Sequence, residues 1–353
     1  MNTAAPEECS ISGLMHIVLR VSNLVGVAPV RFSKVQGAWR IQALSSSVQS
    51  LVISYGVIIL PSLSLTLYWQ ITPTSNEYGI TTHFILWIVN FYIVFVASCV
   101  VRCTASKRMK NFIYCMCQME KMESSLEKSI VCDNLSKTIS SASLLSLVLI
   151  CLITFVFDFY CRLVMNSKIK TIEIMFRLVN FFYIVVMFLA LLQFITVVLK
   201  VYVGLQSVNL RLLKLLNRLR GENHIKGSIE LCVKDLNKKY TIICDAIGRL
   251  NEANGGTAIA ILLACCYMFI RAPYTVISDM ITNVIEPYFA LAMGFWFVLY
   301  CSWMLAIIEP CHRTEDEPTL VQKESSLGRL LQASGNDSGD WRSRLFVLAK
   351  TNV

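Results

Sequence analysis

Residues 204–256 read GLQSVNLRLLKLLNRLRGENHIKGSIELCVKDLNKKYTIICDAIGRLNEANGG, and they lie between two apolar runs of membrane length. The segment carries nine Lys or Arg residues against five Asp or Glu residues, a net charge of +4. Its apolar residues recur at helical spacing, which predicts amphipathic helix. They are Leu212, Leu215, Leu216, Leu219, Leu231, Leu236, Tyr240, Ile243 and Leu250. A basic, amphipathic segment in this position indicates a cytosolic linker between two spans of a membrane protein.

The whole chain is too apolar for a soluble globular protein of 353 residues. Hydrophobic residues make up 55% of it and charged residues only 16%. A spanning helix needs roughly 20 consecutive apolar residues, and six runs reach that length. They are residues 43–68, 82–101, 143–164, 179–203, 257–281 and 288–308. We therefore expect an all-α fold, a polytopic membrane helix bundle with six spans.

The basic residues indicate how the spans are oriented, because Lys and Arg accumulate on the cytoplasmic side of a membrane. Of the 32 Lys and Arg residues, the N-terminal segment holds four, the 102–142 loop seven, the 204–256 linker nine and the tail from Glu309 six; Lys200 adds one. The remaining five lie on the other side, where the 70–81 loop holds none. We predict a multi-pass protein of the cell membrane with both termini in the cytoplasm.

Three regions follow from this topology. Residues 1–42 form a cytosolic N-terminal segment, in which Leu14–Leu24 is expected to be an interfacial helix ended by Gly26 and Pro29. Residues 43–308 form the six-span bundle together with the 204–256 linker, and residues 309–353 form a cytosolic tail. Residues 107–128 are basic and helix-like, which favours a cytosolic extension of the second span with a solvated face.

Motifs for catalysis, metals and cofactors are missing from the sequence. The four His residues are scattered, and no Cys and His set has metal-ligand spacing. There is no P-loop, dinucleotide fingerprint or nucleophile elbow, so we expect no enzyme activity, no metal and no cofactor. The basic residues flank spans instead of forming one face, which argues against nucleic acid as a partner. Voltage-sensor and potassium-filter patterns are also missing.

Candidate ligand-binding residues are the aromatic and small polar side chains in the outer halves of the spans. Ligand sites in bundles are mostly apolar with a few placed polar groups, although an aromatic belt at the membrane interface would give a similar set. Asp158 and Arg162 are four residues apart, so they could form a boundary ion pair or part of an outer vestibule. The candidates are Trp69, Trp87, Asn90, Asp158, Tyr160, Asn180, Tyr183, Tyr267, Tyr274 and Tyr288.

Three short stretches carry a family resemblance. Residues 24–29 (LVGVAP) match an apolar–Gly–x–x–Pro pattern ahead of the first span. Residues 236–240 (LNKKY) with Gly255 and Gly256 precede the fifth span, and residues 309–312 (EPCH) follow the sixth. With the cytosolic N-terminus and the long linker between spans four and five, they resemble the insect gustatory receptor family of seven-transmembrane chemoreceptors. The resemblance covers residues 14 to about 345 by architecture.

The resemblance implies a ligand-gated cation channel subunit that senses a small organic tastant in the outer cavity of the bundle. Other receptor subunits, in a homo- or hetero-tetramer, and membrane lipid are the implied partners. The family's Thr-Tyr…Gln-Phe motif lies in a seventh span, which we expect this chain to lack; Gln193–Phe194 is a chance match. The expected function is a gustatory chemoreceptor subunit, truncated and non-conducting alone. The alternative is a six-span membrane transporter or scaffold protein.

Overall fold

The computed structural model describes residues 9–11, 14–35, 38–44, 82–125, 145–146, 148–160, 171–221, 226–281 and 287–316. Its labelled elements are β1 (Cys9–Ile11), α1 (Leu14–Leu24), β2 (Val30–Val35), β3 (Ala38–Ala43), α4 (Thr82–Cys103), α5 (Ala105–Ser125), α7 (Thr171–Gly221), α8 (Lys226–Ile281) and α9 (Pro287–Asp316). A further apolar helix covers Val148–Tyr160.

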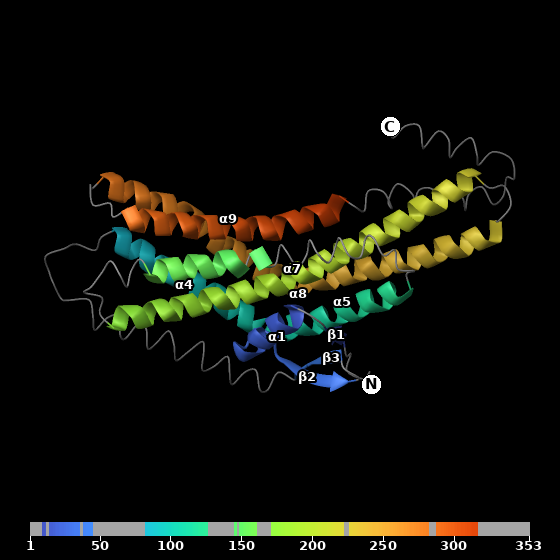
Figure 1. Ribbon diagram of the computed structural model, residues 1–353, viewed down its shortest axis with the longest axis horizontal. Helices are drawn as coiled ribbons and strands as arrows, with labels where there is room; N and C mark the ends of the chain where they lie inside the picture. The colour runs from blue at the N-terminus through green and yellow to red at the C-terminus, as the bar shows by residue number, and fades with distance from the viewer. Residues whose placement is uncertain are drawn as a thin grey trace.

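The helices run along one long axis and divide the molecule into two parts (Figure 1). At one end, α4, the Val148–Tyr160 helix, α9 and the apolar portions of α7 and α8 pack together; we call this part the bundle. At the other end, the 204–256 portions of α7 and α8 extend side by side with α5; we call this part the stem. Each part has its own core of buried apolar side chains.

Five of the six predicted spans correspond to helices of the bundle. In the part of the chain that is described, α7, α8 and α9 are long and apolar enough to cross a membrane. A fourth span results if α4 and α5, bent by 56° relative to each other, are taken together. The third predicted span is the shorter Val148–Tyr160 helix. The first predicted span, residues 43–68, lies outside the described residues except for its first two. Ala43 is the last residue of β3, and Leu44 follows it.

The described parts of the 204–256 segment, residues 204–221 and 226–256, form helix that continues directly from the neighbouring spans. α7 runs from the fourth span into the stem as far as Gly221, and α8 runs from Lys226 through the stem into the fifth span. The predicted apolar stripe is buried at Leu236, Ile243 and Leu250, all members of the stem core. The amphipathic pattern is therefore confirmed for these positions, because one face of α8 packs on α5 while the other meets solvent.

A three-stranded antiparallel sheet in the N-terminal segment was not predicted. Its strand order is β1-β3-β2, with Phe32 opposite Ile41 and Ser33 opposite Arg40. Residues of β2 and β3 alternate between apolar and polar, so Ile41 is buried on one face while Arg31 is exposed on the other. The helix predicted over Leu14–Leu24, by contrast, is present with these bounds as α1, and Gly26 with φ of 80° turns the chain after it.

Candidate functional site

Where α4 faces α7, the bundle contains a buried cluster of aromatic rings and polar side chains. The Tyr183 ring contacts Phe91 and Phe95 edge-on, at centroid distances of 6.0 and 5.5 Å. Asn90 and Tyr183 are both buried, and neither the Asn90 Oδ1 nor the Tyr183 hydroxyl has a hydrogen-bond partner among the described residues. The same holds for the Oδ1 of Asn180, three residues before Tyr183. Two helices thus present unpaired polar atoms to an apolar, aromatic interior.

Tyr267 connects the third helix of this region to the cluster. Its hydroxyl, on α8, donates a hydrogen bond to the carbonyl oxygen of Leu86 on α4 at 2.7 Å. Because Leu86 lies one turn before Asn90, this bond holds α8 against α4 at the level of the cluster. The hydroxyl of Tyr267 is therefore engaged in holding two helices together.

The other candidate residues are placed differently. Tyr160 and Tyr274 are exposed on the outside of the bundle, a position that fits the interfacial-belt alternative. Asp158 is half-buried on the Val148–Tyr160 helix, and Arg162 lies outside the described residues. Trp87 and Tyr288 lie on α4 and α9, with side chains that are not described, and Trp69 lies outside the described residues. Asn90, Asn180, Tyr183 and Tyr267 remain the interior set.

The residues missed by sequence analysis are the aromatic partners of Tyr183 and a buried cation beside Phe182. Phe91 and Phe95 complete the aromatic wall, and Arg102 is buried with its guanidinium 4.8 Å from the ring centroid of Phe182. Arginine over an aromatic face is attracted by the ring quadrupole. Sequence analysis counted Arg102 only as a topology marker, since a basic residue at the end of a span ordinarily reaches solvent.

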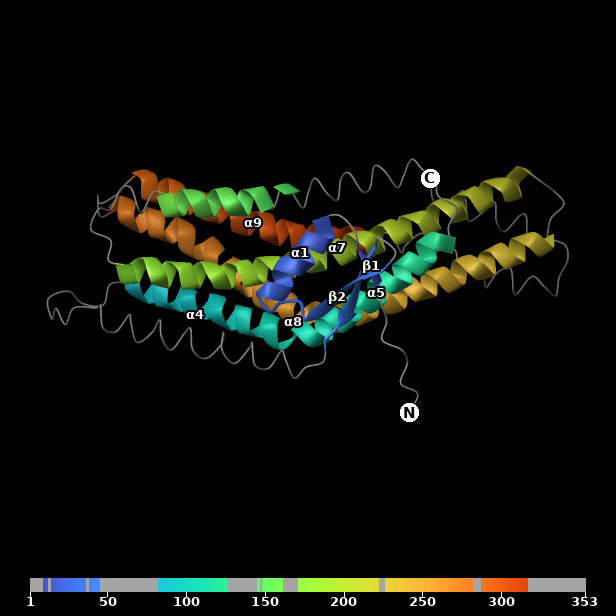
Figure 2. The ribbon, with the colours of Figure 1, turned by 60° about the horizontal axis from the view of Figure 1, so that its bottom comes forward.

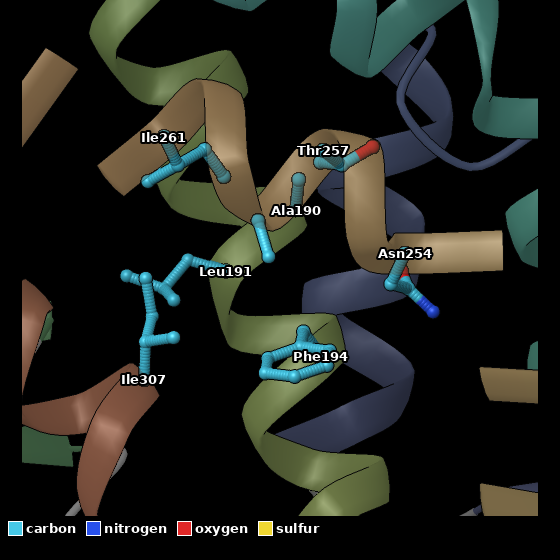
Figure 3. A pocket seen from close by; sticks show the side chains of 8 residues that line it. Ala190, Leu191, Phe194, Asn254, Thr257, Ile261 and Ile307 are labelled. Atoms are coloured by element: carbon cyan, nitrogen blue, oxygen red, sulfur yellow. The ribbon is translucent and has the colours of Figure 1, made fainter. Parts of the chain in front are cut away.

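A second interior feature is a small cavity where the bundle meets the stem. Asn254 and Thr257 of α8 lie on one side of it, Ala190, Leu191 and Phe194 of α7 on another, and Ile307 of α9 on a third; Ala258 and Ile261 also line it (Figure 3). The centre of a water molecule could move over about 10 Å³ in it, room for about one water. Typical ligand pockets hold about 300 Å³ or more, so this cavity does not fit an organic ligand.

The polar groups at this cavity are already engaged. Asn254 Nδ2 donates to the carbonyl oxygen of Leu250 at 3.0 Å. The hydroxyl oxygens of Thr257 and Thr104 lie 3.0 Å apart, and Thr104 is the residue between α4 and α5. The cavity therefore lies at the junction between α4 and α5, and the residues that line it contribute to the packing of the helices.

Among the described residues, no group of His, Cys, Asp and Glu side chains is placed to hold a metal ion. The described cysteines are free thiols. The interior of the bundle thus offers hydrogen bonds, aromatic faces and a guanidinium, which are the groups that recognise an organic molecule by non-covalent contact.

These features define a polytopic membrane protein with a buried aromatic and polar cluster between its helices and a basic helical stem. The family model described as 7tm Chemosensory receptor matches residues 15–333, and the chain belongs to that family. Comparison with curated proteins gave no match. The family membership agrees with the resemblance found from residues 24–29, 236–240 and 309–312, and it establishes a chemoreceptor.

Proposed function

We propose that this chemoreceptor is a gustatory receptor subunit of the ligand-gated cation channel type, and that it senses small organic tastants between α4, α7 and α8. The observation that carries the proposal is two buried polar atoms without a hydrogen-bond partner among the described residues, Tyr183 Oη beside the rings of Phe91 and Phe95, and Asn90 Oδ1 on the same helix as those rings. A buried polar group without a hydrogen bond costs about 1–3 kcal/mol. A ligand that accepts from Tyr183 and donates to Asn90 recovers that free energy.

Such a ligand acts by selecting a conformation. It shifts the receptor only if it binds one arrangement of α4, α7 and α8 more tightly than another. α7 and α8 are each continuous from the cluster into the stem, so a change in their packing at the cluster reaches the stem without crossing a loop. In the proposed orientation the stem faces the cytoplasm, as its basic residues favour.

The test uses purified full-length protein and a panel of small organic tastants, read by the thermal shift each compound produces. For a compound that stabilises the wild type, Tyr183→Phe is expected to raise the dissociation constant about tenfold, because it removes one buried hydrogen bond. Tyr160→Phe makes the same chemical change at an exposed position and is expected to leave the dissociation constant unchanged. Equal affinities for wild type and Tyr183→Phe would place the ligand elsewhere.

Channel activity is tested separately, by recording cation current in cells that express the chain alone or with other receptor subunits. Ligand-dependent current that Tyr183→Phe shifts to higher concentration supports a channel subunit. Saturable substrate flux without unitary currents would instead support a transporter.

A further inference from the structure

The N-terminal helix α1 exposes an apolar stripe on one side. Ile17, Val21 and Leu24, spaced at i, i+4 and i+7, have exposed fractions of 58%, 40% and 86%. The opposite side of the helix is packed, with Leu19 and Ser22 fully buried. An exposed stripe of large apolar residues on an amphipathic helix is a feature of interaction sites and of helices that lie in a membrane interface.

The position of α1 along the molecule coincides with the boundary between bundle and stem. Val18 and Val27 belong to the core of the bundle, whereas Leu19 and Ala28 belong to the core of the stem. Figure 2 shows α1 in front of the middle of α7, near the place where α4 gives way to α5. In a membrane protein, the level at which an apolar bundle changes to a polar stem is the level of the lipid headgroups.

The surroundings of the stripe are basic. Residues 9–44 contain Arg20, Arg31, Lys34 and Arg40 and no Asp or Glu. Arg20 is exposed within the stripe, and its guanidinium lies 4.7 Å from the ring centroid of Trp39. The Lys34 ammonium lies 5.9 Å from the same ring. Lys34 and Trp39 are opposite each other in the sheet, so they share the face that carries Ile41, while Arg31 points to the other face.

We propose that α1 is an anchor for the anionic leaflet on the stem side of the membrane. Ile17, Val21 and Leu24 insert among the acyl chains, and Arg20 and Lys34, held at Trp39, contact the phosphate and carboxylate groups of anionic lipids. Three features select a lipid surface as the occupant: the level of α1 at the bundle boundary, the tryptophan beside two cations, and the lack of any acidic residue in 9–44. Arginine binds phosphate oxygens through two parallel hydrogen bonds, and each basic side chain near an anionic surface strengthens binding about fivefold.

The test is amide hydrogen exchange of α1 in the full chain, reconstituted at one copy per lipid nanodisc. The discs contain either phosphatidylcholine alone or phosphatidylcholine with about 30% phosphatidylserine. The phosphatidylserine gives the disc a negative surface potential that attracts basic residues. We expect exchange of the α1 amides to slow at least about fivefold on adding phosphatidylserine, and the difference to vanish at about 0.5 M salt.

Charge-matched variants separate local headgroup contact from general attraction. Arg20→Gln with Lys34→Gln is expected to abolish the phosphatidylserine effect, whereas Arg31→Gln, on the other face of the sheet, is expected to retain it. Arg20→Lys keeps the charge and is expected to retain most of the effect. Exchange of α7 and α8 reports whether each variant is folded.

Three outcomes would overturn the proposal. The first is equal α1 exchange in the two lipid compositions, and the second is an equal loss of the effect in Arg31→Gln and in the double variant. The third is protection of α1 only when two copies share a disc, which would assign the stripe to a second copy of the chain.

Discussion

A single buried arginine links the N-terminal segment to the stem. The Arg108 guanidinium, on α5, donates to the carbonyl oxygen of Val27 at 3.2 Å, and Arg108 is only 2% exposed. Burial lowers the pKa of Arg108 to about 10, so it stays charged at neutral pH. Val27 lies three residues after the end of α1, which means that Arg108 ties the turn after α1 to α5.

Arg108→Ala is expected to lower the unfolding free energy by about 2 kcal/mol, because it leaves the buried Val27 carbonyl without its donor. The measurement is the midpoint of thermal unfolding in detergent. Lys110→Ala, on an exposed position of the same helix, is the matched control and is expected to change the midpoint little. Equal shifts for the two variants would show that the Arg108 hydrogen bond contributes nothing.

A surface ion pair between α5 and α8 is expected to make the stability of the fold depend on pH. Lys107 Nζ and Glu252 Oε1 lie 2.7 Å apart, and the hydrogen bond and charge of Lys107 lower the pKa of the Glu252 carboxyl. A carboxyl whose pKa is lower in the folded state stabilises the fold above its ordinary pKa of 4.5, and the stabilisation is lost as the pH falls through the folded-state pKa.

We therefore expect the unfolding midpoint of the wild type to lie slightly above that of Glu252→Gln at pH 7. At a pH well below the ordinary pKa of the carboxyl, we expect the two midpoints to be equal. Both side chains are exposed, so the difference is small and shrinks in high salt. Unfolding midpoints of the two proteins across pH 3 to 7 measure it. A difference between them that persists unchanged in acid would contradict the assignment.

At the scale of elements, Gly204 lets α7 approach α5 closely. A Cβ at this position would lie 2.8 Å from Met122 Cε and 3.3 Å from Met119 Sδ. Gly248, on α8, has no atom within 4 Å of the place its Cβ would occupy. The two helix glycines therefore differ in the space around them.

The substitutions Gly204→Ala and Gly248→Ala are expected to change stability by different amounts, with a smaller gain or none at Gly204. Alanine favours helix over glycine by about 1 kcal/mol, so Gly248→Ala should stabilise. At Gly204 the same gain is offset by overpacking of about 1–3 kcal/mol, lessened because the methionine side chains are flexible. Thermal midpoints of the two variants measure the contrast. A clear gain at Gly204 equal to that at Gly248 would refute close packing of α7 on α5.

The helical elements could be predicted because each leaves a strong pattern in the sequence. The bounds of α1 followed from its apolar periodicity and from Gly26, and α4, α7, α8 and α9 followed from apolar runs of membrane length. The sheet was missed because the alternation in β2 and β3 is short and contains arginines. The break at Thr104 has no Gly or Pro to signal it, and the contacts of the Thr104 hydroxyl, with the Val100 carbonyl oxygen and the Thr257 hydroxyl, are not visible in the sequence.

Only part of the candidate site could be predicted, for a geometric reason. Tyr160, Tyr183 and Tyr274 all lie in apolar helices. A tyrosine in such a helix can lie either at the membrane interface or in the interior, so residue type does not separate the three. Tyr183 is buried because its side of α7 faces α4, whereas Tyr160 and Tyr274 point away from the bundle. Which side of a helix faces its neighbours is set by packing with helices distant in the sequence, so it could not be inferred from any one span.

At the scale of the whole molecule, the basic stem and the basic ends of the spans predict the orientation of the chain in the membrane. Residues 204–256 hold nine of the 32 Lys and Arg residues, and α5 and the N-terminal segment hold further ones, whereas the 70–81 loop holds none. Transferring so many charges across the bilayer during insertion is costly, which is the reason that basic loops stay in the cytoplasm. The stem, α1 and the N-terminus should therefore lie on the cytoplasmic side together.

An epitope tag at the N-terminus is accordingly expected to be stained only after cells are permeabilised. The same tag inserted within residues 70–81, the loop without basic residues, is the matched control and is expected to be stained on intact cells. Immunofluorescence with and without detergent measures both. Because orientation follows the sum of flanking charges, a single substitution in the stem should not reverse the pattern. Staining of the N-terminal tag on intact cells would reverse the assignment of the stem to the cytoplasm, and with it the leaflet that α1 contacts.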